Sequence, residues 1–281
     1  MMRILTDSTC DLPDELLAQH DIRVIPINIQ FGTDSYQEGV TIDCTTFYSM
    51  VDELQMIPTT SQPSAGRFAE VYRELAAEGA DSIMSIHVTS KLSGTYQSAE
   101  LARQMVADEV TVHTFDSASG STGLGFMALE AAQMAEAGES ATSILERLQE
   151  LRQRMRILFT MADLRYAQMS GRVGKLKGTL ASVLDLKPIV GMDDGVIDVV
   201  AQVRARKKAV SQILALMEAE IGTTEPVNLA VMHAEAPEEG QELLERARGR
   251  FNCQTSFLED LAVSLVANLG PGTLGLIGYR I

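Results

Sequence analysis

Apolar runs typical of buried strands alternate with helix-like patterns along the first half of the chain. After Ser64, for example, the apolar residues Phe68, Val71, Tyr72 and Leu75 recur three and four positions apart, as on one face of a helix. The predicted strands are Arg3–Thr6, Asp81–Val88 and Val110–Phe115, and the helices that follow the last two are Thr95–Val106 and a segment ending near Ala137. Strands that alternate with helices pair in parallel through right-handed crossovers. The pattern therefore predicts an α/β domain with a doubly wound, mostly parallel sheet.

One segment of this half, Ile22–Phe31, departs from the alternation. It is partly alternating in polarity and contains Pro26, which has no N–H group to donate to a sheet ladder. We therefore predict an edge strand that pairs with Tyr36–Ile42, as a β-hairpin insertion at about residues 22–42.

The second half of the chain has a different pattern. Two apolar runs, Lys187–Met192 and Val196–Val200, flank Asp193-Asp194-Gly195, which is a favourable sequence for a hairpin turn. The other predicted elements are strands at Ile157–Met161 and Val227–Met232 and helices at Lys207–Ile221 and Glu238–Arg250. A hairpin combined with helices indicates an α+β domain. We predict an N-terminal α/β domain of residues 1–157 and a C-terminal α+β domain of residues 158–281.

Composition and charge narrow the class of protein. The 281 residues are 46% hydrophobic and 22% charged, and no apolar run is long enough for a membrane span. The formal net charge of −15 makes nucleic acid a poor partner, because phosphates would meet a repulsive field. The three cysteines, Cys10, Cys44 and Cys253, form no disulfide-like or metal-binding pattern. We therefore expect a cytoplasmic protein.

Two hydroxyl-rich segments, Thr59–Ser64 and Thr89–Tyr96, are predicted to be loops that run into helices. The first N–H groups of a helix are unpaired and favour negative charge, and Gly94 would let a ligand approach the backbone. Because the carboxyl ends of parallel strands share one edge, we expect the second segment to lie beside Thr6–Thr9 and Asp116–Ser119. The alternative is that Ser64 and Ser93 only cap helices. Two such segments together favour an anion-binding site.

Motifs for catalysis or metal binding are missing from the sequence. Asp7-Ser8-Thr9 lacks the second aspartate of haloacid dehalogenase-type phosphohydrolases, and the four histidines form no pair with metal-ligand spacing. We expect His87 to be a core histidine and Asp7 to hold loop N–H groups. Binding without catalysis is thus favoured. An enzyme acting on a small phosphorylated or carboxylated metabolite at the same sheet edge stays open, as does a structural dimerisation module.

An ordered set of short motifs spans nearly the whole chain. They are Thr6–Thr9, Thr60–Ser64, Ser90–Tyr96, Asp116-Ser117, Ser170–Arg172, Lys187–Ile189, Val203–Lys208 and Gly270–Gly272. This set closely resembles the DegV family of bacterial fatty-acid-binding proteins.

The resemblance implies a fold and a ligand. The fold is an N-terminal doubly wound α/β domain followed by a C-terminal α+β domain, with a long-chain fatty acid in a buried tunnel. By the family pattern, Thr60 and Ser93 hydrogen-bond the carboxylate, with Ser61, Gly94 and Asn268 as head-group neighbours. Asn268 stands where many family members have a histidine, so this side chain can donate a hydrogen bond but cannot carry charge.

The resemblance also implies a partner. Family members carry the fatty acid to a separate ATP-dependent fatty-acid kinase, which forms an acyl phosphate for phospholipid synthesis. Such a carrier is not itself an enzyme, needs no cofactor or metal, and makes at most a transient membrane contact. Arg172 and Arg204 resemble residues of the partner-docking surface, which would explain why basic residues crowd Arg172–Lys208 in an acidic chain.

Overall fold

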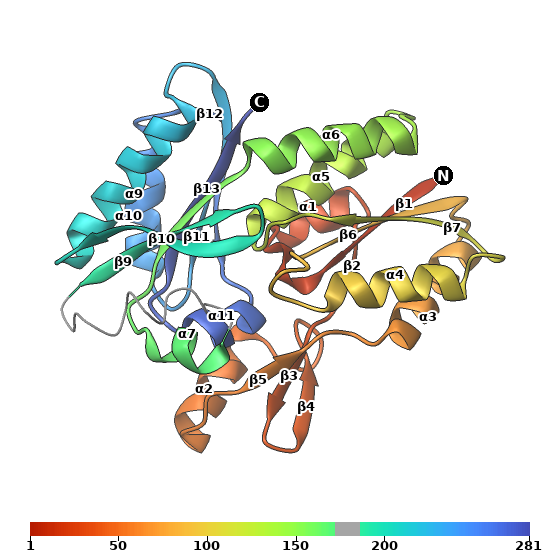
Figure 1. The fold of residues 1–281 in the computed structure, drawn as a ribbon, viewed down its shortest axis with the longest axis horizontal. Coiled ribbons are helices and arrows are strands. Elements are labelled where there is room, and N and C mark those ends of the chain that lie inside the picture. The colour runs from red at the N-terminus through yellow and green to blue at the C-terminus, as the bar shows by residue number, and fades with distance from the viewer. Residues whose placement is uncertain (172–185) are drawn as a thin grey trace. The chain divides into compact units, whose positions relative to one another are not determined.

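The computed structural model describes residues 1–171 and 186–281 of the chain. These residues form two compact units, Met1–Gln153 and Arg154–Ile281 (Figure 1).

The first unit is built on a four-stranded parallel sheet with the order β2-β1-β6-β7. Its strands are β1 (Met2–Asp7), β2 (Arg23–Ile25), β6 (Ser82–His87) and β7 (Thr111–Asp116). The helices of this unit are α1 (Asp14–Gln19), α2 (Cys44–Leu54), α3 (Ala65–Ala77), α4 (Thr95–Met105), α5 (Thr122–Glu136) and α6 (Ala141–Arg154, whose last residue opens the second unit), with a 3-10 turn η1 at Ser8–Cys10. The predicted alternation of strands and helices is confirmed.

Helices cover both faces of this sheet. α3 and α4 lie on one face, and α5 and α6 lie on the other (Figure 1). On the α3 side, Leu5 and Ile83 of the sheet are fully buried in one cluster with Phe68, Tyr72 and Leu75 of α3. These are the helix positions whose spacing predicted an apolar face, and their burial gives the doubly wound fold that we expected.

The predicted strand Ile22–Phe31 is two strands. β2 ends before Pro26, as an edge of the parallel sheet, and β3 (Asn28–Phe31) begins a separate antiparallel sheet with the order β4-β3-β5. Pro26 has no N–H group to continue the ladder, so the chain changes sheet there. The predicted hairpin exists, but β3 pairs with β4 (Asp34–Gln37) rather than with residues up to Ile42.

The third strand of the small sheet corrects another expectation. Thr59–Ser61, which we expected in a loop, is β5, and Thr60 pairs with Ile29 of β3. β-Branched threonines suit an extended strand, but the pairing partner lies about thirty residues away, so no local pattern revealed it.

The order of the parallel strands defines where a ligand can bind. From β1 the chain runs to β2 on one side, and then crosses to β6 on the other side of β1. The loops after β1 and β6 therefore leave the sheet in opposite directions. Such a switch point at the carboxyl ends of the strands opens a crevice where α/β proteins bind ligands.

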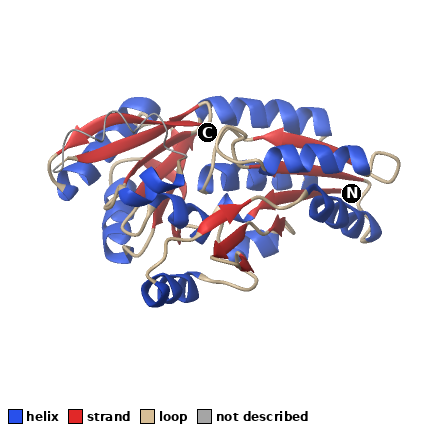
Figure 2. Cartoon of the chain, turned by 60° about the horizontal axis from the view of Figure 1, so that its bottom comes forward, coloured by secondary structure: helices blue, strands red, loops and turns tan. Residues whose placement is uncertain are grey.

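The second unit contains a six-stranded mixed sheet with the order β10-β9-β8-β13-β11-β12. Its elements are β8 (Arg156–Thr160), α7 (Arg165–Ser170), β9 (Lys187–Asp193), β10 (Val196–Val203), α9 (Arg206–Ile221), β11 (Pro226–His233), α10 (Pro237–Arg248), β12 (Asn252–Asp260), α11 (Val263–Leu269) and β13 (Leu274–Arg280). Figure 2, with strands in red and helices in blue, shows both units as mixtures of strand and helix. The predicted hairpin is present as antiparallel β9 and β10.

The core of the second unit lies between its sheet and α9 and α10. Ile213 and Met217 of α9 and Leu243 of α10 are fully buried against Leu229 and Leu276 of the sheet. This arrangement confirms the predicted α+β class. Within the described residues, no helix is both long enough and apolar enough to cross a membrane.

Candidate functional site

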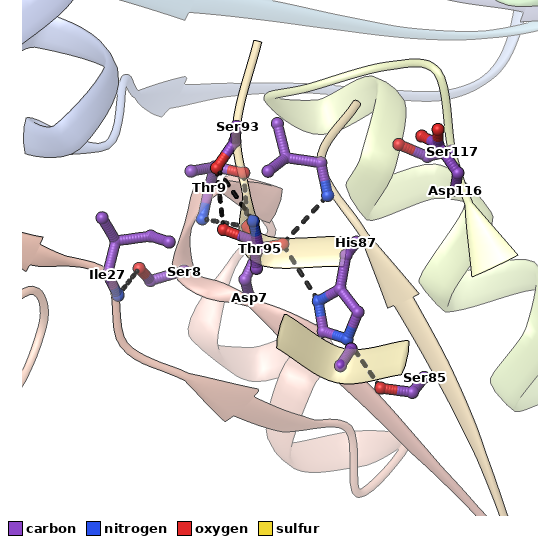
Figure 3. Close-up of polar contacts among 12 residues, drawn as sticks. Asp7, Ser8, Thr9, Ile27, Ser85, His87, Ser93, Thr95, Asp116 and Ser117 are labelled. Carbon is purple, nitrogen blue, oxygen red and sulfur yellow. Dashed lines mark hydrogen bonds and ion pairs between the residues drawn. The ribbon is translucent and has the colours of Figure 1, made fainter. Parts of the chain in front are cut away.

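Asp7, the last residue of β1, organises the crevice at the switch point. It is fully buried, and its carboxylate accepts hydrogen bonds from Thr9 N (3.2 Å), Thr9 Oγ1 (2.5 Å) and Val88 N (2.9 Å). His87 Nδ1 lies 3.1 Å from Oδ2, the same carboxylate oxygen that accepts from Val88 N (Figure 3). The predicted role of Asp7, holding loop N–H groups, is confirmed, and the loops after β1 and β6 are tied together by it.

A chain of buried polar groups continues from His87 into the core. His87 Nε2 lies 2.6 Å from Ser85 Oγ, and Ser85 Oγ lies 2.9 Å from the Tyr72 hydroxyl. Burial raises the pKa of Tyr72, so its hydroxyl stays protonated. The ring of Phe68 packs edge-on against His87. With both ring nitrogens bonded and no exposed surface, His87 is the core histidine that we expected.

The loop after β7 joins the same edge. Thr89 N donates to Ser119 O (2.8 Å), Ser117 N donates to His87 O (3.0 Å), and Ser90 N donates to Asp116 Oδ1 (3.1 Å). The expected gathering of the Thr6–Thr9, Ser90–Ser93 and Asp116–Ser119 segments is thus confirmed by direct bonds between neighbouring loops.

Ser93 lies just before α4. Its Oγ accepts a hydrogen bond from Thr95 N (3.3 Å) and lies 2.8 Å from the Oγ1 of the buried Thr95. When Thr95 Oγ1 donates, both lone pairs of Ser93 Oγ are used and its own proton is free to donate to an anion. Ser93 therefore stabilises the start of the helix, as we expected if it were a cap. Its hydroxyl can also donate a hydrogen bond to a ligand.

Ser64, by contrast, acts as a cap. Its Oγ accepts a hydrogen bond from Arg67 N (3.1 Å) at the start of α3. Of the two serines considered as caps, this one shows no contact towards the crevice, and the capping interpretation accounts for its position.

Thr60 and Ser61 have hydroxyls without a hydrogen-bond partner in the described part of the chain. Thr60 pairs with the fully buried Ile29, and paired residues share a face, so its half-buried side chain points to the covered face of the small sheet. A half-buried hydroxyl without a protein partner can donate a hydrogen bond to a ligand. Ser61, the next residue, points to the opposite face.

The side chain of Gln62 joins the two hydroxyl-rich segments. A methyl group placed on Gly94 would lie 2.7 Å from Gln62 Nε2 and 3.0 Å from Gln62 Cδ. The space beside Gly94 is therefore occupied by the Gln62 amide. Sequence reasoning had not singled out Gln62, although its position before Pro63, which restricts it to an extended backbone, places it on the same side of the chain as Thr60.

Ser8 connects the crevice to the small sheet. Its hydroxyl accepts a hydrogen bond from Ile27 N (2.9 Å; Figure 3). The same hydroxyl donates to the buried Glu38. Glu38 N in turn donates to Ile27 O (3.0 Å), so the approach to β3 is fixed to the loop after β1. In the part of the chain that is described, no cluster of three or more histidine, cysteine or acidic side chains could hold a metal ion.

Asn268 belongs to the second unit, in α11. Its Nδ2 donates to Ser264 O (2.6 Å), one helical turn earlier. The Gly270–Gly272 motif that follows needs its glycines, because Gly270 (φ 85°) and Gly272 (φ 73°) are left-handed. A methyl group on Gly270 would also lie 2.8 Å from the Tyr166 ring of α7. The motif thus fixes the end of α11, and with it Asn268, against α7.

Part of the basic stretch lies outside the described residues, namely Arg172, Lys175 and Lys177. Arg204 is exposed and makes no ion pair within the part of the chain that is described. Arg206 is paired instead, with its Nε 2.8 Å from Glu239 Oε2. Among the arginines of the motif Val203–Lys208, Arg204 is therefore the one whose charge is available to another molecule.

Comparisons with known proteins agree on one family. The family described as "Uncharacterised protein, DegV family" matches residues 1–280. The chain is 34% identical over 274 residues to Protein DegV of Bacillus subtilis, covering 97% of each chain. The solved structure of a DegV family protein from Thermus thermophilus, described by its fatty acid binding, is 32% identical, with a TM-score of 0.92 and coverage of 100% of this chain and 99% of that one. A stearic acid-binding protein from Eubacterium ventriosum is 27% identical, also with a TM-score of 0.92, covering 100% of this chain and 98% of its own.

Proposed function

This chain belongs to the DegV family, and on that premise we propose that it is a carrier of long-chain fatty acids. The fatty carboxylate is held by Thr60 and Ser93, with Ser61, Gly94 and Asn268 as head-group neighbours, and the acyl tail lies in a buried tunnel. The protein presents the carboxylate to a separate fatty-acid kinase for conversion to an acyl phosphate. It is not itself an enzyme and uses no cofactor.

The observation that carries this proposal is the pair of hydroxyl donors at the crevice. Thr60 has a half-buried hydroxyl with no partner among the described residues, and the Ser93 hydroxyl can donate a hydrogen bond to a ligand. The contact between Gln62 and Gly94 holds their two segments together. Hydroxyl donors suit a carboxylate, which accepts hydrogen bonds at both oxygens.

The chemistry of the neighbouring groups supports binding rather than catalysis. Asp7 and His87, two titratable groups of this sheet edge, are fully buried and are bonded to each other and to the loops. A general base must reach the proton that it removes from a substrate. Both residues are instead parts of the scaffold that shapes the crevice.

The energy of binding would come mainly from the tail. Burying each methylene is worth about 0.8 kcal/mol, so a chain of sixteen carbons contributes roughly 10 kcal/mol or more. Each hydrogen bond to the charged carboxylate contributes about 1.5–3 kcal/mol. The tail therefore sets the affinity, and the donors set the position of the carboxylate for transfer.

The exposed Arg204 supports a docking surface for the kinase on the second unit. Its charge has no acidic partner in the described part of the chain and can pair with an acidic group of another protein. We assign Arg172 to the same surface on the family resemblance alone.

Native mass spectrometry of freshly purified protein, followed by solvent extraction and analysis of the extract, tests the proposal. We expect a bound mass equal to that of a long-chain fatty acid, which the extract then identifies. A polar metabolite in its place would support an enzyme at the same edge. Protein that carries no ligand and takes up no palmitate would contradict the carrier function.

A further inference from the structure

The backbone conformation of residue 94 does not explain why a glycine stands beside Gln62. Gly94 has φ −82° and ψ 4°, a conformation that any residue can adopt. What requires glycine here is space, because a methyl group would lie 2.7, 3.0 and 3.4 Å from Nε2, Cδ and Oε1 of Gln62. All three heavy atoms of the amide group thus lie against one Cα, which admits the amide only because it has no side chain.

A role in holding the two segments together does not by itself explain why a polar amide lies at this contact. The Gln62 side chain is exposed and makes no hydrogen bond to any described residue, so its two N–H groups and its carbonyl oxygen are free. The backbone around it is already fixed, since Asn28 Nδ2 donates to Gln62 O (3.4 Å) and the buried Pro63 follows. The amide therefore starts from a fixed backbone, lies beside Gly94 and is available to a ligand.

The neighbours of the amide are the proposed carboxylate donors. Thr60 lies in β5, and Gln62 follows the end of this strand directly before Pro63, which favours an extended backbone, so we expect both side chains on the same side. Ser93 is bonded directly to Gly94 and offers its proton at the start of α4. Gln62 therefore lies beside the glycine that follows Ser93, two residues after Thr60, so the three neutral donors belong to the two segments that meet at this contact.

We propose that Gln62 is a third donor to the ligand carboxylate and that Gly94 is small in order to admit it. This inference rests on the proposed fatty-acid binding and adds a binding residue to that site. A neutral amide stabilises a carboxylate through a hydrogen bond without neutralising its charge. The carboxylate oxygen therefore keeps the electron density that it needs to attack a phosphoryl group.

A double-mutant cycle on the delipidated full-length protein tests the role of Gln62. The probes are palmitate and 1-hexadecanol, which share a tail and differ in the head group, and their dissociation constants are measured by calorimetry. We expect Gln62→Ala to weaken palmitate binding about tenfold or more, because a hydrogen bond to a charged group is lost. Binding of 1-hexadecanol should change less than twofold.

Gly94→Ala provides the second arm of the cycle. The added methyl group meets the far end of a flexible side chain, so the amide should swing away while the fold persists. We expect the loss of palmitate affinity to match that of Gln62→Ala, and the double variant to be no weaker than either single one. Gly66→Ala, four residues after Gln62 and with only Ser64 Oγ at 3.7 Å, is the matched control and should bind as the wild type does.

A spectroscopic measurement gives a readout that a structural defect would not reproduce. In ¹³C NMR titrations of carboxyl-labelled palmitate, loss of a donor to the ionised form should raise the pKa of the bound carboxyl group in both single variants. Unchanged palmitate affinity in Gln62→Ala, equal losses for both probes, or additive losses in the double variant would overturn the role of Gln62 while leaving the carrier function standing. Wild-type protein that binds neither probe would overturn both.

Discussion

At the scale of single residues, Ser93 has two roles. It accepts a hydrogen bond from Thr95 N at the start of α4, and it has a proton to offer a ligand. Sequence spacing alone left these two tasks as alternatives, whereas the geometry allows both. The consequence is that removing the hydroxyl should affect stability and ligand position together, and the two effects must be measured separately.

We predict that Ser93→Ala weakens transfer more than binding. Loss of one hydrogen bond to the charged carboxylate should raise the dissociation constant of palmitate about tenfold to a hundredfold, while the tail contacts are kept. Phosphorylation of bound palmitate by the kinase subunit, measured at saturating ligand, should fall by more than that factor because the carboxylate is no longer fixed. Ser98→Ala, on the same helix, is the control. Equal losses in binding and in transfer would contradict this division.

His233, at the end of β11, makes stability depend on pH. Its imidazole is buried, and this burial lowers its pKa below the usual 6.5, although the nearby carboxylates of Asp260 and Glu238 oppose the shift. As the pH falls through 6.5, the unfolded chain therefore takes up a proton before the folded one does, and the free energy of unfolding decreases. Well above pH 6.5, His233 is neutral in both the folded and the unfolded chain, and its contribution to the free energy of unfolding is fully present.

Urea unfolding midpoints between pH 7.5 and 5.5 should show this loss. In His233→Phe, which keeps a ring but cannot titrate, the pH dependence should be shallower over the same range. An equally steep dependence in the variant would assign the effect to other groups, such as the carboxylates.

At the scale of elements, close packing of α5 on the loop after β1 supports the crevice. A methyl group on Gly125 of α5 would lie 2.3 Å from Cys10 O and 2.8 Å from Leu12 Cγ. Neither the backbone nor the buried Leu12 can move away freely. Helix α5 thus approaches the turn η1 and the segment after it as closely as the missing side chain allows, and this contact fixes the position of Ser8 and Thr9.

We predict opposite effects of the same substitution in two helices. Gly125→Ala should lower the free energy of unfolding by about 1–3 kcal/mol through overpacking. Gly66→Ala in α3, where the new methyl group meets only Ser64 Oγ at 3.7 Å, should raise it by about 0.4–1 kcal/mol. Chemical denaturation of both variants measures the difference, and a stabilised Gly125→Ala would contradict the close approach.

For the whole molecule, the proposed division between tail and head group predicts a chain-length series. At about 0.8 kcal/mol per methylene, each methylene changes the affinity about fourfold, so myristate should bind about fifteenfold more weakly than palmitate. Ser93→Ala should shift both dissociation constants and leave their ratio unchanged. Titration calorimetry with the two acids measures the ratio, and equal affinities would show that the tail does not set the affinity.

The sequence by itself determined the fold class, the proposed hydroxyl donors Thr60 and Ser93, and most of the helices and strands. Periodicity is local, so the spacing of Phe68, Tyr72 and Leu75 predicted a helix with a buried face, which the structure confirms. Pro26 predicted an edge strand, but the sequence did not show that the chain changes sheet there. The ordered motifs pointed to the DegV family, which the comparisons confirm.

The tertiary structure alone decided which polar groups have partners. Asp7 is bonded to Val88, 81 residues away, and the Gln62 amide lies against Gly94. Such contacts depend on strand order and on the switch point between β1 and β6, which no local pattern encodes. The strand at Thr59–Ser61 was missed for the same reason, because its partner β3 is distant in the sequence. The sequence had already assigned Asp7 and His87 to the scaffold, but only the fold showed the bonds that engage them and added Gln62 to the groups available to a ligand.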